Sequence, residues 1–327
     1  MINNDTYQER PQLIVIVGPT AVGKSEVAAR VAQRLGGEVV SCDAMQVYRG
    51  LPICTAVPSA SVRALALHHG LEMIERSEEW SAARFVAFAT SAIEQVVTRQ
   101  SVPVLIGGSG LYVRSLLDGL CPAPAADWEL RRRLLDEAAA SGGERLHQRL
   151  AAVDAIAASR IHPHNVRRVI RALEVYERDG QPLSQLQRQT VGIADRYRVA
   201  MIGLTASRPL LYRWIDARVE AMVARGLVEE VRRALQQPMG RTAERVLGVP
   251  EIAGYLRGER ELDEAARLLQ RNSRRYAKRQ LTWFRADARI QWIERGEPDT
   301  IDTLVDRVVA LLPAERWAAR SAVGVAS

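Results

Sequence analysis

The sequence predicts an α/β fold in which helices flank a parallel sheet and an all-helical domain is inserted. Three observations support it. Apolar, β-branched runs alternate with helical patterns over the first 120 residues, a glycine-rich loop joins the first such run to a helix, and residues 128–188 contain only helical patterns. Strands that alternate with helices imply a parallel sheet covered on both faces, with ligands bound beyond the carboxyl ends of the strands.

The first element is the run Leu13–Val17, which predicts a buried strand. The motif that follows it reads Gly18-Pro19-Thr20-Ala21-Val22-Gly23-Lys24-Ser25, and apolar residues at helical spacing come next. Strand, G-x-x-x-x-G-K-[ST] loop and helix together form a P-loop, whose backbone N–H groups and helix N-terminus cradle phosphate. We therefore expect a P-loop NTPase-like core in which Lys24 binds terminal phosphates and Ser25 is a ligand of Mg²⁺.

The basic residues of the chain single out the same lysine. Of 45 basic residues only Lys24 and Lys278 are lysine, and arginine occupies every other position. A lysine kept against such a bias favours a place that needs a compact ammonium group and not a guanidinium fork, and chance survival of two lysines is the alternative.

Later runs extend the alternation of strands and helices. We expect strands at Glu38–Cys42, Val102–Ile106 and Arg198–Leu204, and helices at 81–98, 209–225 and 263–285. A proline-rich break in composition begins at Cys121. The sequence therefore predicts a core formed by residues 1–120 and 198–312, a helical insertion domain at 121–197 and a flexible tail at 313–327.

The bulk composition limits the class of protein. A net charge of +7 and a pI near 9.7 favour an anionic partner, although many proteins are mildly basic without one. Three scattered cysteines do not form a disulfide framework, and the histidines at 68–69 and 162–164 have no cysteine or acidic residue at metal-binding spacing. The start of the chain has no signal-peptide core, and no apolar run approaches the roughly 20 residues of a membrane span. We expect a cytoplasmic protein that acts as a monomer and does not bind membranes.

Two polar residues follow predicted strands and should share a crevice with the P-loop. Asp43 is the best candidate for a general base, although an aspartate there could also cap a helix or turn. Ser109 lies in the turn Gly107–Gly110, where its hydroxyl could contact a phosphate or a leaving oxygen, or simply belong to a tight turn.

Two predicted helices are rich in arginine. In the first, Arg167, Arg171 and Arg178 lie away from the apolar face, and in the second, at 263–285, seven basic residues contrast with two acidic ones. A face that neutralises several phosphates gives salt-dependent binding of nucleic acid. A solvated helix face is the alternative for both.

These segments, in this order, resemble those of the bacterial tRNA dimethylallyltransferases, isopentenyl transferases that act on the adenosine beside the anticodon. The resemblance runs from about residue 13 to 295. The segments that carry it are Gly18–Ser25, Ser41–Gly50, Gly107–Tyr112, Ile161–Glu174 and Lys278–Arg285.

The resemblance implies that the P-loop holds the diphosphate of dimethylallyl diphosphate and that no nucleotide is consumed. It implies that Asp43 accepts the proton of the exocyclic adenine N6, that Ser109 lies near the leaving-group oxygen and that Arg218 binds the diphosphate. The tRNAs it implies are those that read codons starting with U. The implied tRNA-contacting positions are Asp43, Ala44, Met45, Gln46, Ser109, Arg131, Arg167, Arg168, Val169, Ile170, Arg171, Lys278 and Arg279.

The chain departs from the family pattern at three places. Cys54 and Val57 stand where the family has glycine and lysine, Val249 and Pro250 where it has tyrosine and a basic residue, and Trp214 where it has an arginine. Because the P-loop lysine and the candidate base remain, we expect an active enzyme with altered recognition of its substrate.

Two other functions fit parts of the sequence. A P-loop small-molecule kinase would turn over ATP, but glycines follow Val102–Ile106 where a Walker B aspartate would be expected. An isopentenyl transferase that acts on free AMP would need neither the helical insertion nor the basic helices.

Overall fold

The structure is a computed structural model that describes residues 10–122, 124 and 126–313 of the chain. The chain forms two compact units, one before residue 117 and after residue 193, the other at Leu117–Ile193. The helical domain was expected at 121–197, so the second unit begins and ends four residues earlier. Apart from residue 313, the tail expected at 313–327 lies outside the described residues.

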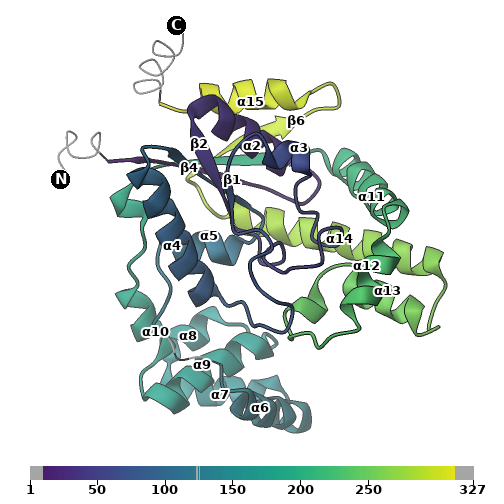
Figure 1. The fold of residues 1–327 in the computed structure, drawn as a ribbon. Helices are drawn as coiled ribbons and strands as arrows, with labels where there is room; N and C mark the ends of the chain where they lie inside the picture. The colour runs from purple at the N-terminus through teal and green to yellow at the C-terminus, as the bar shows by residue number, and fades with distance from the viewer. Residues whose placement is uncertain (1–9, 123, 125, 314–327) are drawn as a thin grey trace, which may run out of the picture. The chain divides into compact units, whose positions relative to one another are not determined.

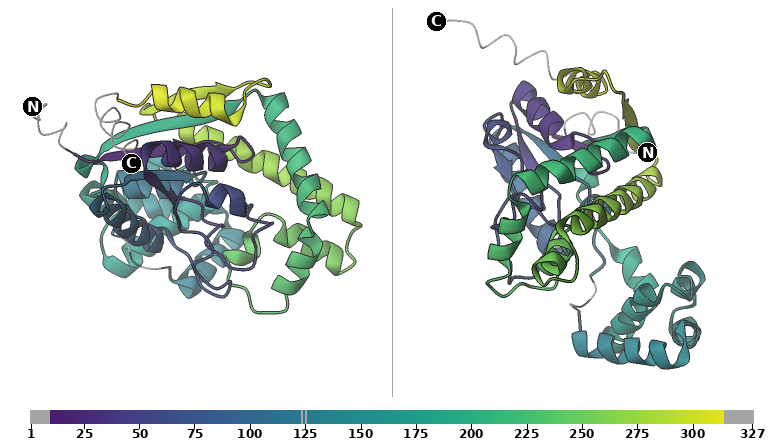
Figure 2. Two further views of the ribbon diagram at one scale, coloured as in Figure 1. Left: turned by 45° about the horizontal axis from the view of Figure 1, so that its top comes forward. Right: turned by 90° about the vertical axis from the view of Figure 1, so that its right-hand side faces the viewer.

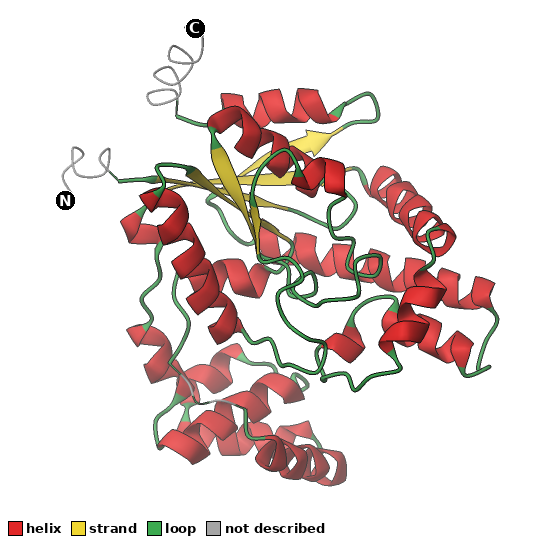
Figure 3. Ribbon diagram, viewed as in Figure 1, coloured by secondary structure: helices red, strands yellow, loops and turns green. Residues whose placement is uncertain are grey.

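The centre of the first unit is a six-stranded parallel sheet of order β3-β2-β4-β1-β5-β6 (Figure 3). Its strands are β1 (Gln12–Val17), β2 (Gly37–Ser41), β3 (His68–His69), β4 (Val102–Gly107), β5 (Arg198–Ala206) and β6 (Ile290–Arg295). In the register, Ile14 of β1 lies opposite Val104 of β4 on one side and Ala200 of β5 on the other. The predicted α/β fold with a parallel sheet is confirmed.

Helices cover both faces of this sheet. Ile14 and Ile16 point to one face, where they pack in a common core with α2 (Lys24–Leu35) and α15 (Ile301–Ala310), two helices that run side by side (Figure 2). The other face is covered by α4 (Ala82–Thr98) and α5 (Gly110–Leu117) (Figure 1). The remaining helices are α3 (Ala60–Arg63), α11 (Arg208–Ala224), α12 (Leu227–Ala234), α13 (Val249–Leu256) and α14 (Leu262–Arg285).

The P-loop, residues Gly18–Ser25, makes a sharp turn between β1 and α2. Gly18 has φ +145°, and a Cβ there would lie 2.3 Å from the carbonyl oxygen of Leu204. Gly23, which precedes the first helical residue, has φ +100°. Only glycine adopts such angles without strain, so these two positions let the loop pass close to β5 and then enter the helix.

The second unit is all-helical in the residues described. Its helices are α6 (Trp128–Ser141), α7 (Gly143–Val153), α8 (Ala155–Arg160), α9 (Val166–Asp179) and α10 (Leu183–Leu186). Leucines of α6 and α7 pack against Val169, Ile170 and Leu173 of α9 to form its core. A fully buried carboxylate, Glu174, lies beside this core.

In the part of the chain that the structure describes, every helix is too short or too polar to cross a membrane.

Candidate active site

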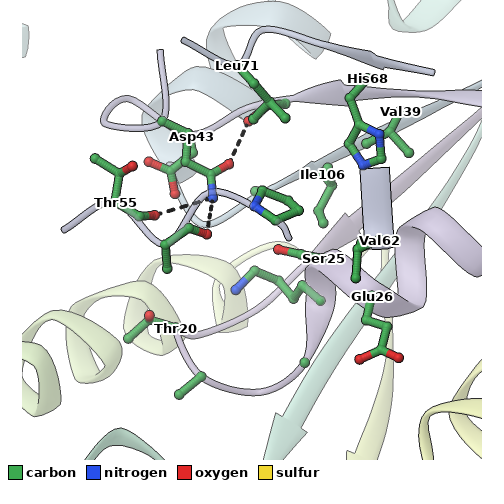
Figure 4. Close-up of a pocket in the computed structure, with 18 of the residues that line it drawn as sticks. Thr20, Ser25, Glu26, Val39, Asp43, Thr55, Val62, His68, Leu71 and Ile106 are labelled. Carbon is green, nitrogen blue, oxygen red and sulfur yellow. Dashed lines mark hydrogen bonds between the residues drawn. The ribbon is translucent and has the colours of Figure 1, made fainter. Parts of the chain in front are cut away.

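A cavity of about 320 Å³ opens at the carboxyl ends of the strands, with the P-loop as one wall. Figure 4 shows Thr20 and Ser25 on that wall, Asp43 and Thr55 above them, and a largely apolar end where His68 lies among Val39, Val62, Leu71 and Ile106. The expected meeting of Asp43 with the P-loop is therefore present. Arg218, Tyr276 and Gln280 also line the cavity.

Lys24 is the first residue of α2, and its ammonium lies inside the curve of the P-loop. Nζ donates a hydrogen bond of 2.6 Å to the carbonyl oxygen of Pro19. Burial lowers the pKa of Lys24 to about 7, with the negative charge of Asp43 opposing this shift and the positive charge of Arg218 adding to it. Without an anion, the lysine is thus held by its own loop and is poorly stabilised as a cation.

Arg218 brings a second cation to the loop from α11. Its Nη1 donates to the hydroxyl of Thr20 at 2.8 Å. Burial lowers the pKa of Arg218 and Asp43 opposes the shift, but an arginine stays protonated at any physiological pH. Lys24 and Arg218 therefore place two cations near one carboxylate, an arrangement that suits an anionic ligand.

Asp43 follows β2 on a tight loop. Its Oδ1 accepts a hydrogen bond of 2.9 Å from the backbone N–H of Met45, which fixes the carboxylate direction. The next backbone N–H, of Ala44, donates to the Ser109 hydroxyl at 3.2 Å. Ser109 is thus joined to the Asp43 loop, although it is not among the residues that line the cavity.

A second cavity, of about 170 Å³, shares a wall with the first. Residues common to both include Thr20, Asp43, Arg218 and Tyr276. Its other lining is mostly apolar and comes from α11, α14 and loop residues such as Met45 and Cys54, with Arg245 and Arg279 also present. Because Asp43 lines both cavities, its carboxylate can contact a ligand bound in either one.

Sequence reasoning missed two residues of α14 that complete this wall. Gln280 bridges two glycine turns: its Oε1 accepts from the N–H of Thr20 at 2.8 Å, and its Nε2 donates to the carbonyl of Gly108 at 3.1 Å. Tyr276 has a raised pKa, chiefly through burial and then through Asp43. In the sequence, Gln280 had stood out only as part of the segment Lys278–Arg285, with no role of its own.

The donor set at the P-loop fits a Mg²⁺ ion that arrives with a phosphate ligand. In the described ranges no cluster of three or more His, Cys, Asp or Glu side chains could hold a metal ion. Ser25 and Asp43 nevertheless line the same cavity. Mg²⁺ commonly takes one or two protein oxygens and completes its shell with substrate phosphates and water.

Of the paired histidines, His68 lines the first cavity, and each ring has a hydrogen-bond partner. His68 Nδ1 lies 2.8 Å from the carbonyl of Ala66, and His69 Nε2 lies 2.7 Å from Glu38, which also binds Arg99. The bond from Arg99, with the smaller effect of His69, lowers the pKa of Glu38 to about 2 against the effect of burial.

The candidate tRNA-contacting residues of the first unit differ in whether their side chains are free to contact a partner. Lys278 and Arg279 are exposed on α14. Met45 lines the second cavity, and Ala44 is fixed by Ser109 as described. Gln46 is used internally, because its Nε2 donates to the carbonyl of Ala56 at 3.0 Å.

In the helical unit, Arg167 and Arg168 are exposed, whereas the side chains of Val169 and Ile170 are buried in the core and are closed to a partner. Two further candidates hold a buried acid: Arg131 forms two bonds of 2.9 Å to Glu174, and Arg171 forms one of 2.6 Å. Burial raises the pKa of Glu174, but these bonds outweigh it, so the pKa is lowered overall.

The departures from the family pattern lie in distinct surroundings. The backbone N–H groups of Ile53 and Cys54 donate to the buried carboxylate of Glu230 at 2.8 and 2.7 Å. Val249 is buried at the start of α13, so it offers no surface to a substrate. Trp214 packs under a guanidinium, that of Arg295, 4.4 Å from the ring centroid.

Comparison with known proteins agrees with this geometry. The family model of IPP transferase matches residues 46–287, and that of isopentenyl transferase matches residues 11–66. The chain is 44% identical over 304 residues to a tRNA dimethylallyltransferase of Geobacter metallireducens, which covers 92% of this chain and 98% of that protein.

Solved structures of tRNA-modifying transferases are also similar to this chain. A tRNA isopentenylpyrophosphate transferase of Bacillus halodurans matches with 38% identity and a TM-score of 0.67, covering 92% of this chain and 97% of that one. A eukaryotic dimethylallyltransferase acting on tRNA matches with 26% identity and a TM-score of 0.76, covering 91% and 77%. The chain therefore belongs to the IPP transferase family, the family of the tRNA dimethylallyltransferases.

Proposed function

We propose that this protein transfers a dimethylallyl group from dimethylallyl diphosphate to the exocyclic N6 of the adenosine 3′ to the anticodon, and releases diphosphate. The tRNAs proposed are those that read codons starting with U. The observation that carries the proposal is the wall shared by the two cavities, where Asp43 lies opposite the P-loop and interacts electrostatically with Lys24 and Arg218.

The P-loop is the proposed diphosphate site. Breaking the bond between the allyl carbon and oxygen leaves negative charge on the diphosphate and positive charge on carbon. Backbone N–H groups of the loop, the ammonium of Lys24 and the guanidinium of Arg218 are preorganised donors for that leaving charge. At the far end of the same cavity, apolar side chains around His68 suit the five-carbon chain.

Asp43 is the proposed base. The amine attacks the allyl carbon as the diphosphate departs, a C–N bond replaces the C–O bond, and the proton of the amine passes to the carboxylate. The bond from Met45 N–H holds the carboxylate at the shared wall. The adenine must leave its stack to reach an enclosed site, as bases do in other base-modifying enzymes.

A magnesium ion, when bound, would neutralise part of the diphosphate charge, with the Ser25 hydroxyl as its proposed protein ligand. The exposed cations of the two units, Arg167 and Arg168 in one and Lys278 and Arg279 in the other, are the proposed tRNA contacts. A tRNA substrate also favours a cytoplasmic location, and we propose action as a monomer.

The kinase alternative is less well supported. After β4, which ends at Gly107, the chain continues with Gly108 and Ser109, so no aspartate stands where a Walker B residue would hold Mg²⁺. Transfer to free AMP leaves the exposed arginines of the helical unit unused.

The test is incubation of the purified protein with Mg²⁺, a tRNA transcript and either dimethylallyl diphosphate or ATP, followed by mass analysis of the nucleosides. The expected product is adenosine heavier by one dimethylallyl group, formed only with the allyl donor. A transcript with guanosine in place of the target adenosine is the matched control. Phosphoryl transfer from ATP, or modification of free AMP in preference to tRNA, would overturn the proposal.

A further inference from the structure

The last residue of β6, Arg295, reaches back to the P-loop. Its Nη1 donates a hydrogen bond of 3.1 Å to the carbonyl of Val22 and would lie 2.9 Å from a Cβ built on Gly23. Its guanidinium also lies over the ring of Trp214, on α11. Arg295 is thus clamped between an aromatic face and the loop backbone.

This contact fixes the direction of one loop peptide. In a trans peptide the C=O and the following N–H point in opposite directions. Gly23 lines the cavity and Arg295 does not. A guanidinium that holds the Val22 carbonyl outward therefore holds the Gly23 N–H toward the place where the P-loop receives phosphate.

The charge of Arg295 is also left uncompensated. Among the residues that the structure describes, no carboxylate forms an ion pair with Arg295, and its buried Nε has no hydrogen-bond partner. Arg295 is half-buried, and a cation that loses part of its hydration without an acidic partner is costly to hold. Stacking on tryptophan offsets part of this cost, and an anion in the adjacent cavity would offset more.

We propose that Arg295, held by Trp214, is a positioning residue for the diphosphate: it presents the Gly23 N–H to the anion and adds positive charge behind the loop. The inference rests on the proposed diphosphate site. It also gives Trp214 a role, because the tryptophan that replaces the family's arginine packs against a cation supplied by β6.

The experiment measures the affinity for inorganic diphosphate with Mg²⁺ by calorimetry, together with KM for dimethylallyl diphosphate and for tRNA. Arg295→Ala should weaken diphosphate binding and raise the allyl-diphosphate KM about tenfold, as expected for one lost charged hydrogen bond. KM for tRNA should change less than twofold. Arg295→Lys should recover part of the affinity, and Trp214→Leu should lose an intermediate amount.

Arg213→Ala is the matched control. Arg213 neighbours Trp214 on α11, but it is exposed and pairs with Glu297 at 2.9 Å. Its removal should leave diphosphate affinity unchanged. If a folded Arg295→Ala or Trp214→Leu protein binds diphosphate as the wild type does, or loses only tRNA affinity, the inference is wrong. If the wild-type protein itself fails to bind diphosphate, the proposed function fails instead.

Discussion

Replacing Lys24 by methionine should stabilise the unliganded protein while abolishing diphosphate binding. The pKa of this lysine falls from 10.5 to about 7 in the folded protein, chiefly through burial. The native fold therefore carries a cation that it does not solvate well. A bound anion would stabilise this charge. Methionine has a similar shape and removes that charge.

The pKa difference sets the size and the pH window of the effect. Held as a cation, Lys24 costs the fold up to about 5 kcal/mol, an upper bound because its side chain lines an open cavity. Below pH 7 both folded and unfolded states are protonated and the full cost applies. Between pH 7 and 10.5 only the unfolded state keeps the proton, so the wild type gains about 1.4 kcal/mol per pH unit.

The assay is urea unfolding of wild type and Lys24→Met, followed by circular dichroism without ligand from pH 6 to 10. The variant should be more stable by about 2 to 5 kcal/mol at pH 6, and the gap should close as pH rises. Lys278→Met is the matched control: it removes the only other lysine, which is exposed, and should change stability by less than about 0.5 kcal/mol. A gap that is absent at pH 6, or that widens with pH, would refute the reasoning.

Three further predictions concern other parts of the molecule. Asp43→Asn should lower single-turnover prenylation by about 10²-fold or more while both substrates still bind, and near-normal turnover would exclude it as the base. Arg167→Ala should weaken tRNA binding on every transcript and reduce the slope of log K against log salt by about one, as filter binding at several salt concentrations would show. Glu174→Ala should destabilise the helical unit by about 3 kcal/mol, because Arg131 and Arg171 lose their buried partner. Hydrogen exchange should show reduced protection of amides in the helical unit, and unchanged protection there would contradict this prediction.

The sequence predicted the four strands that contain at least two adjacent apolar or β-branched residues in a buried run. The starts of β1, β2, β4 and β5 lie within one residue of the expected positions, because β-branched runs beside glycine have few other stable conformations. Two strands were missed. β3 has only two residues, both histidine, and β6 mixes Ile290 and Ile293 with polar residues, as an edge strand does.

At the site, the sequence identified residues that belong to a local motif. Lys24 and Asp43 each follow a recognisable strand, so their convergence could be expected. The roles of Gln280 and Arg295 could not be predicted, because their contacts join the P-loop to segments 260 and 273 residues away. The same limit explains Arg131: a local pattern shows that the side chain is basic, but not that a buried carboxylate already holds it.

The order of the chain has a consequence for the timing of synthesis. The P-loop is made early, but Arg218, Gln280 and Arg295, which tie it down, all come after the helical unit. β1 likewise receives its neighbour β5 only after residue 197. A nascent chain that has exposed the P-loop and the whole helical unit still lacks these partners. We therefore expect the loop to bind an anion only after the residues of the helical unit have been synthesised.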